Sequence, residues 1–341
     1  MNWENQAEKT FKKTTINDVA RIAGVSSATV SRVINGTASV RPQKIQAVQK
    51  AIKTTGFQIS TAAQNLARGK SNAYAVVLTE PINELLTDPT FAAIFQGVLQ
   101  ELSQTSVTPL LLLSSTHMEQ EKTLRLFERK AADAIIHLSP YTDDLFLEEL
   151  ATLNLPVVLC GKPRKLAPSQ FSMIYADDKI ATMQAGKFLI SKGSQKILAI
   201  LGPENNPATI DRLDGYKAVL GSMLLPSVFY GSWATSHGYT AAKQAFRQGL
   251  TFDTVVAGND RIAAGVLAAA QEINLNIPKD LKILGFDNHP IAIESIPQIS
   301  TISSPFYEQG TQAVKLAQEL TEGGSPKTQL LETTIIDRET T

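Results

Sequence analysis

Several polar and aromatic residues follow apolar, β-like runs in the second half of the chain. Trp233 follows FYGS, Asn259 follows TVVAG and Asp287 follows LKILGF, while Arg212 lies at the start of the helical segment ATIDRLDGYKAV. Ligands of doubly wound α/β folds bind beyond the carboxyl ends of the strands. An aromatic ring can cover the apolar face of a pyranose, and arginine, asparagine and aspartate can bond neighbouring hydroxyl groups. This set suits a sugar, and a nucleobase or nucleoside could use the same groups.

The sequence offers little for other kinds of chemistry. Its one cysteine, Cys160, ends PVVLC without a histidine and aspartate partner pattern, so we expect a buried thiol at a strand end. His117, His137, His237 and His289 have no metal-ligand spacing. Neither a phosphate-binding loop nor a dinucleotide-binding glycine pattern occurs. We therefore expect no enzyme activity, no metal and no cofactor.

Composition limits the class of protein. The 341 residues, 43% of them hydrophobic, exceed a single core and predict two or three globular units. No apolar run approaches the roughly 18 residues of a membrane span, and the start MNWENQAEKTFKKTT lacks the apolar segment of an export signal. A lone cysteine excludes a disulfide framework and agrees with a reducing compartment, so we expect a cytoplasmic protein.

The net charge of zero hides an asymmetry between two parts of the chain. The totals are 32 basic and 32 acidic residues, yet residues 1–70 carry eleven basic and three acidic side chains, a net charge of +8. The remainder therefore carries −8. A small basic head is joined to a larger acidic body, and the charge of the head suits a polyanionic partner.

Three short helices are predicted in the basic head. Thr15 opens a T-x-x-D capping box, and the helix that follows stops at Gly24. Ser26 or Ser27 can cap a second helix over residues 28–34. Two short helices joined by a tight glycine-containing turn are typical of a helix-turn-helix, and a three-helix bundle with a solvated basic face is the alternative. The third helix begins at Pro42, and its apolar face consists of Ile45, Val48, Ala51 and Ile52.

Beyond residue 72, short β-rich runs alternate with helical stretches. The runs are YAVVLT, LLLLS, DAIIHL, PVVLC, KILAIL, SVFYG, TVVAG, LKILGF and TISS. Continuous apolar strands separated by helices indicate parallel sheets that are covered on both faces. Nine strands fit two Rossmann-like lobes of about four to six strands each better than one small sheet.

The head resembles a known family. The stretch TINDVARIAGVSSATVSRVINGTASV is similar to the head of lactose-repressor and purine-repressor (LacI-type) bacterial transcription factors, which share a T-I-x-D-V-A-x-x-A-G-V-S-x-x-T-V-S-R-V-x-N-G run. Nearly every position from Thr15 to Gly36 matches, and the family's A-x-x-L-x-x-G-x-S hinge pattern is matched from Ala63 to Ser71. The resemblance covers the whole chain and is weaker beyond residue 72. It implies an all-α helix-turn-helix head plus an α/β periplasmic-binding-protein-like core of two Rossmann-like lobes.

The resemblance also implies domain boundaries and DNA contacts. We expect a DNA-binding domain over residues 14–58, a hinge helix and linker over 59–71, and an effector-binding and dimerisation core over 72–341. The N-lobe of this core would span about 72–173 and 304–332, and the C-lobe about 174–303 and 333–341. The DNA-binding residues implied are Thr15, Ser26, Ser27, Ala28, Thr29, Ser31, Arg32, Asn35 and Leu66. Of these, Ser26, Thr29, Ser31 and Asn35 would hold phosphates, and Ser27, Ala28 and Arg32 would face bases.

In the core, the resemblance assigns effector binding to five residues. They are Phe91, Arg212, Trp233, Asn259 and Asp287. Gly161 stands where the lactose repressor offers a carboxylate after the fourth strand, which weakens an inference of a galactoside. We expect a ligand-responsive repressor of carbohydrate-utilisation genes, released from double-stranded operator DNA by a small sugar or sugar derivative.

Two other functions are alternatives to the sugar-responsive repressor. One is a regulator that responds to a nucleoside or nucleobase. The other is a sugar-binding transport protein, which would need an export signal and would lack the basic head.

A homodimer on a pseudo-palindromic operator is expected, because a two-fold protein matches a two-fold site. The chain ends at TTIIDRETT without the leucine-heptad helix that forms tetramers in the resembling family.

The expected hinge helix is too short to be stable alone. Ser60 can cap about eight residues, Thr61 to Arg68, whereas an isolated helix needs roughly 12 to 15 residues in water. Its apolar face suits pairing with the same helix of a second subunit, and the resemblance implies that paired Leu66 side chains wedge into a base step from the minor groove.

We predict that Leu66→Ala weakens binding to specific operator DNA while the protein remains folded, because the variant loses the minor-groove wedge but no core contact. Fluorescence anisotropy with labelled operator measures the affinity, and circular dichroism checks the fold. Operator binding equal to that of the wild type would remove this assignment.

Overall fold

The computed structural model describes residues 14–35, 40–57, 70–138, 145–163 and 169–341. The chain divides into two compact units, residues 1–71 and 72–341. The hinge helix expected around Leu66 lies outside the described residues. Within the described ranges, no helix is both long and apolar enough to cross a membrane.

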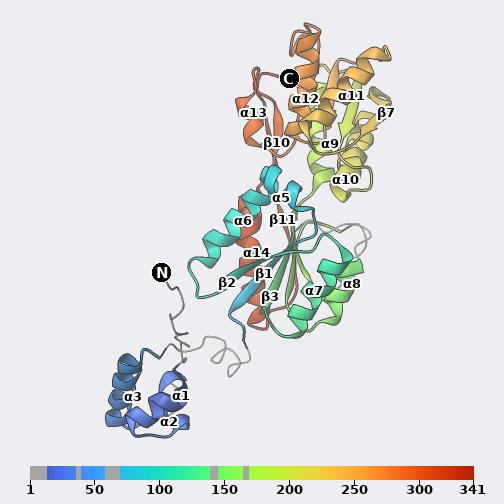
Figure 1. Ribbon diagram of the computed structural model, residues 1–341. Helices are drawn as coiled ribbons and strands as arrows, with labels where there is room; N and C mark the ends of the chain where they lie inside the picture. The colour runs from blue at the N-terminus through green and yellow to red at the C-terminus, as the bar shows by residue number, and fades with distance from the viewer. Residues whose placement is uncertain (1–13, 36–39, 58–69, 139–144, 164–168) are drawn as a thin grey trace, which may run out of the picture. The chain divides into compact units, whose positions relative to one another are not determined.

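The head contains the three predicted helices, α1 (Ile16–Ala23), α2 (Ser27–Asn35) and α3 (Pro42–Thr55) (Figure 1). Thr15 forms the predicted capping box, and Gly24 ends α1 with a left-handed φ of 64°. The hydroxyl of Ser26 accepts a hydrogen bond from the Thr29 amide, so Ser26 caps α2. Val19, Ala20, Val30, Val48 and Ala51 form the buried core of this unit. Ile52 packs against that core, and Ile45 is half-buried.

The first sheet of the core has six parallel strands in the order β11-β5-β4-β3-β1-β2. They are β1 (Ala73–Leu78), β2 (Thr108–Leu113), β3 (Ala134–Leu138), β4 (Val157–Cys160), β5 (Ser172–Ala176) and β11 (Thr328–Leu331). In Figure 1, α6 (Pro89–Leu102) and α14 (Phe306–Thr321) cover one face, and α7 (His117–Glu128) and α8 (Leu145–Thr152) cover the other. Neighbouring side chains of β1 enter different clusters: Val76 lies with α6 and α14, and Val77 lies with α7 and α8. This alternation explains why the strands are apolar throughout.

The second sheet has four parallel strands in the order β7-β6-β8-β9. They are β6 (Ile197–Leu201), β7 (Leu224–Tyr230), β8 (Thr254–Ala257) and β9 (Lys282–Leu284). Residues of α9 (Asp178–Ser191) and α10 (Pro207–Leu220) share one hydrophobic cluster with this sheet, and residues of α11 (Thr235–Arg247) and α12 (Asp260–Glu272) share the other. The remaining elements are α5 (Ile82–Thr87), the 3-10 turn Gly221–Met223, α13 (Pro290–Glu294), and an antiparallel ribbon of β10 (Thr301–Ser303) and β12 (Thr334–Ile336).

The chain passes between the two lobes along three described segments. These follow β5, join β10 to α14, and join β11 to β12. The first passage lies after Ala176, slightly beyond the boundary expected near 173, because β5 still pairs with β4 and β11.

All nine predicted strands are present, and the structure adds β5, β11 and β12. These three strands are short and mix polar with apolar residues, so they lack the continuous apolar run on which the prediction relied.

Glycines bring the main helix pairs close together. In the N-lobe, a Cβ on Gly97 of α6 would collide with the carbonyl oxygen of Tyr307, and one on Gly310 of α14 would collide with that of Ile94. In the C-lobe, a Cβ on Gly238 of α11 or on Gly265 of α12 would collide with a backbone carbonyl oxygen of the other helix. Backbone packed against backbone therefore fixes the position of α6 and α12, whose first residues reach the space between the lobes.

We predict that Gly310→Ala lowers the free energy of unfolding by about 1–2 kcal/mol, because overpacking at α6 outweighs the gain in helix propensity. Urea denaturation followed by circular dichroism measures the change. Lys315→Ala, at an exposed position of the same helix, is the control and should have little effect. A Gly310→Ala protein more stable than wild type would contradict this packing.

Candidate functional site

The helix-turn-helix presents small and polar side chains on α2. Ser27, Ala28 and Arg32 are exposed, and Thr29 and Ser31 are half-buried. The hydroxyls of Ser26 and Thr29 lie 2.9 Å apart and share a hydrogen bond. With few bulky groups on this surface, the α2 backbone can approach base edges and phosphates closely.

Three predicted DNA-binding residues lie outside this surface or cannot be described in full. Thr15 caps α1, and its hydroxyl donates to the Asp18 carboxylate at 2.7 Å. Bonds from Thr15, the backbone bond first, and from Arg21 lower the pKa of Asp18 to about 2, so this cap stays charged. Asn35 ends α2, but its side chain is outside the described residues, and so is Leu66.

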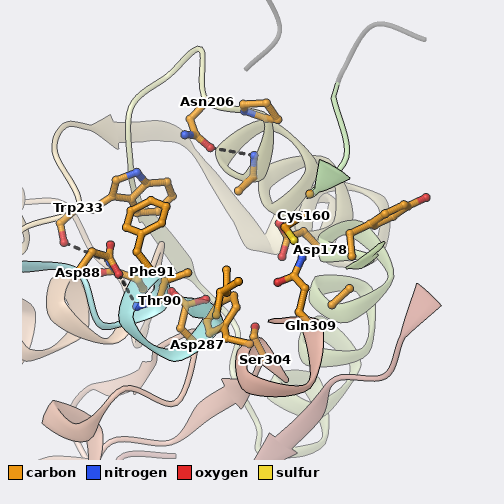
Figure 2. Close-up of a pocket in the computed structure, with 18 of the residues that line it drawn as sticks. Asp88, Thr90, Phe91, Cys160, Asp178, Asn206, Trp233, Asp287, Ser304 and Gln309 are labelled. Carbon is orange, nitrogen blue, oxygen red and sulfur yellow. Dashed lines mark hydrogen bonds between the residues drawn. The ribbon is translucent and has the colours of Figure 1, made fainter. Parts of the chain in front are cut away.

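A cavity of about 340 Å³ lies between the two lobes of the core, a size suited to a small molecule. Phe91, Arg212, Trp233, Asn259 and Asp287, the five residues predicted to bind the effector, all line it. In Figure 2, Phe91 and Trp233 lie toward one end of the cavity, and Cys160 and Asp178 lie toward the other.

Arg212 of α10 is the centre of the polar contacts in this cavity. Its Nη2 lies 3.2 Å from an oxygen of Asp287 and 3.3 Å from an oxygen of Asp178. Its Nη1 donates to the carbonyl oxygen of Gly258, and the guanidinium stacks 3.6 Å from the ring centre of Phe286. Burial disfavours the charged guanidinium, but the two carboxylates outweigh this effect and raise the pKa of Arg212.

Arg212 has a hydrogen-bond donor that no described residue uses. Its side chain is only 8% exposed. Its buried Nε has no hydrogen-bond partner among the residues that the structure describes. An unpaired buried donor is costly, and because this atom is buried, a ligand oxygen could pair with it only after the cavity wall moves.

Two glycines support the indole of Trp233. A Cβ on Gly202, after β6, would lie 2.5 Å from the indole, and one on Gly258, after β8, would lie 3.1 Å from it. The ring therefore lies against bare backbone at the carboxyl ends of two strands. Asn259 holds the backbone of Trp233, since its Nδ2 donates to the Trp233 carbonyl while its Oδ1 caps α12.

Asp287 is held in an uncommon backbone conformation. Its φ is +95°, a region that residues with a side chain rarely adopt, and such strain clusters at functional sites. The amide of Asp287 donates to the Ile302 carbonyl at 2.7 Å, and Arg212 holds its carboxylate. Strong local bonds thus fix a carboxylate in the cavity wall.

Direct contacts tie the two lobes together beside the cavity. Asp88 caps α6 in the N-lobe and accepts a 2.7 Å bond from Arg261 of α12 in the C-lobe. Next to it, the hydroxyl of Thr90 shares a 3.0 Å hydrogen bond with the ring of His289. Phe91 follows directly and lines the cavity. Any separation of the lobes along this edge must break both contacts.

Sequence reasoning missed other polar residues that line the cavity. Asp178 is the most important: burial raises the pKa of its carboxyl to about 6, although Arg212 acts in the opposite direction. It was missed because β5, which directly precedes it, was not predicted. Gln309 was missed as well; its side chain donates to the Ile174 carbonyl from within α14.

Cys160 ends β4 and is buried, as predicted. Burial raises the pKa of its thiol well above the usual range, so the thiol is not activated. Among the described residues, no group of three or more histidine, cysteine, aspartate or glutamate side chains could hold a metal ion.

A helix-turn-helix head and a two-lobed core with a polar cavity define a ligand-controlled DNA-binding protein. Residues 15–60 match the model for the lacI family of bacterial regulatory proteins, and residues 187–341 match that for a periplasmic binding protein-like domain. Catabolite control protein A of Priestia megaterium is 30% identical over 89% of this chain and 91% of its own length. The ribose operon repressor of Bacillus subtilis is 30% identical over 89% of this chain and 90% of its own length. The chain belongs to the lacI family of bacterial regulatory proteins.

Solved structures agree with this assignment. A transcriptional regulator CelR–cellobiose complex covers 96% of this chain and 100% of its own, with 27% identity and a TM-score of 0.74. A lac repressor dimer bound to operator and the anti-inducer ONPF matches with a TM-score of 0.80 over 96% of this chain and 99% of its own. At 23% identity, this second likeness shows the fold.

The buried carboxyl of Asp260 predicts that the stability of the protein depends on pH. It accepts bonds from the Thr301 hydroxyl and the His289 amide, and burial raises its pKa from 3.8 to about 8. Since the folded state holds this proton more tightly than the unfolded state, the Asp260 contribution to stability falls as pH rises from about 4 to about 8.

We therefore expect the Tm of wild type relative to Asp260→Asn to fall between pH 5 and pH 9, because only the wild-type carboxyl has to lose a proton in the buried state. Differential scanning calorimetry across this range measures it. Asp280→Asn is the control, since bonds from Asn276 lower the pKa of Asp280 and its effect should be constant. A constant difference for Asp260→Asn would contradict the raised pKa.

Proposed function

We propose that this protein is a sugar-responsive repressor of carbohydrate-utilisation genes that acts as a homodimer on a pseudo-palindromic operator. The observation that carries the proposal is one cavity in which a buried arginine, two carboxylates and an indole ring come together, in a chain that also carries a helix-turn-helix. Arg212, Asp287 and Asn259 would bond hydroxyl groups, and Trp233 and Phe91 would cover the apolar faces of the ligand.

The names of the relatives support a sugar. One relative is a ribose operon repressor, and one solved neighbour is a complex with cellobiose. The cavity also has the chemistry for a sugar, because each hydroxyl group needs both a donor and an acceptor, and Arg212 and its carboxylates supply them side by side.

DNA binding would use α2 and the hinge. Ser27, Ala28 and Arg32 would face bases, and Ser26, Thr29, Ser31 and Asn35 would hold phosphates, with Thr15 at the start of α1. Leu66 would enter the minor groove from the hinge. We include in the proposal that the protein works in the cytoplasm, where operator DNA is found, and that it catalyses no reaction.

The switch would operate through the lobes. The cavity is lined by a residue from each of the three passages between the lobes, namely Ala176, Ser304 and Leu331. A bound ligand would therefore contact the segments that connect the lobes. A ligand that fits one arrangement of the lobes better than the other shifts the balance between them. The Asp88–Arg261 and Thr90–His289 contacts belong to the arrangement of the lobes described above. The proposed inducer would favour one of the two arrangements, and this would change the hinge helices that contact DNA.

A thermal-shift screen of sugars and nucleosides tests the proposed effector. A sugar at 100 times its Kd should stabilise the protein by about 2.7 kcal/mol, and it should release labelled operator at similar concentrations. A response to nucleosides alone would replace the sugar with the alternative ligand class.

We expect Arg212→Ala to abolish the sugar response. Because this change also leaves two buried carboxylates facing each other, Trp233→Ala is the second variant, and it should weaken the response without removing a charge. Arg247→Ala, at an exposed position of α11, is the control. A normal response in both cavity variants would refute the site.

A further inference from the structure

We infer that the effector is an uncharged sugar, and that the charges of the cavity exclude sugars that carry a phosphate or a carboxylate. The inference rests on the proposed function, since it names the chemical class of ligand for the same cavity.

Acidic side chains outnumber basic ones in the cavity wall. Among the described residues, the lining carboxylates are Glu80, Asp88, Asp178, Asp211 and Asp287, and the lining cations are Lys162 and Arg212. Counting Arg261, which is paired with Asp88 beside the cavity, the carboxylates still exceed the cations by two. Among the described side chains, an anionic ligand would therefore meet more carboxylates than cations.

Each of these cations is already paired with a carboxylate. Arg212 contacts both Asp178 and Asp287, and Arg261 contacts Asp88 at 2.7 Å. A phosphate bound by Arg212 would have to compete with two fixed carboxylates within a few ångströms of the same guanidinium. Sites that recognise phosphate instead direct uncommitted arginine, lysine or backbone donors at it.

Among the described residues, Lys162 is the lining cation that one substitution could free, because it pairs with one carboxylate whereas Arg212 pairs with two. Its Nζ lies 3.8 Å from an oxygen of Asp211 and 5.8 Å from the ring centre of Tyr175. Asp211 is on α10, one position before Arg212, so a single carboxylate partly offsets the charge of the lysine.

The titration of Asp178 agrees with this distribution. Burial is the main cause of its raised pKa, but Asp287 and Asp211 also raise it, against the pull of Arg212. Burial and these two neighbouring carboxylates thus both disfavour a further negative charge beside Asp178. A neutral hydroxyl group meets no such resistance, because it can donate to the carboxylates that line the cavity.

The test compares matched ligands on the full-length protein by isothermal titration calorimetry. The neutral sugar with the largest thermal shift is measured beside its 6-phosphate, its 6-carboxylate and its 6-O-acetyl derivative. The acetyl group is neutral and bulky, so it separates the effect of charge from that of size. We expect the phosphate and carboxylate forms to bind at least tenfold more weakly than the acetyl form.

Asp211→Asn frees Lys162 and removes one negative charge. We expect this change to lower the ratio of the Kd of the 6-phosphate to the Kd of the acetyl form at least fivefold. Asp214→Asn makes the same charge change on the same helix without lining the cavity, and it should leave the ratio unchanged.

A phosphorylated or acidic sugar that binds the wild type as tightly as its acetylated counterpart would overturn the inference while leaving the sugar-responsive regulator intact. Equal effects of Asp211→Asn and Asp214→Asn would also overturn it, because the discrimination would then not arise in the cavity. If no sugar of either kind binds, the proposed function itself fails.

Discussion

The ion cluster of Arg212, Asp178 and Asp287 is the interaction on which the ligand site depends. A buried charge is tolerated only when it is paired, and here one guanidinium holds two carboxylates and a carbonyl oxygen. The three residues come from α10, from the start of α9 and from the turn after β9. Removing the arginine would leave two buried carboxylates close together, so the cluster fixes three separate segments of the C-lobe at one end of its sheet.

Close packing of backbone places the other walls of the cavity around this cluster. Gly97 and Gly310 let α6 approach α14, and Gly202 and Gly258 let the indole of Trp233 lie on the strand ends. The contacts that tie the lobes, Asp88 to Arg261 and Thr90 to His289, start from the first turn of α6. The position of α6 therefore decides both the shape of the cavity and the strength of the connection between the lobes.

The zero net charge of the chain is the sum of a basic head and an acidic core. The head carries the excess of basic residues that phosphate binding requires, and the acidic residues belong mainly to the core. Some of these acids line the cavity between the lobes, where they would accept hydrogen bonds from the hydroxyl groups of the proposed sugar. In a regulator of the lacI family, the basic head suits DNA and the acidic core suits a separate ligand-binding role.

The sequence alone determined the helix-turn-helix and the nine predicted strands, because these features depend on local capping and on periodicity, and the family resemblance pointed to the five residues of the cavity. It did not reveal β5, β11 and β12, since short strands of mixed polarity become stable only when neighbouring strands supply their hydrogen bonds. Missing β5 meant missing Asp178, and the pairing of Asp178 with Arg212 brings together residues 34 positions apart. Only the tertiary structure could decide the charge balance of the cavity, because that balance depends on which carboxylates from both lobes face the same enclosed space.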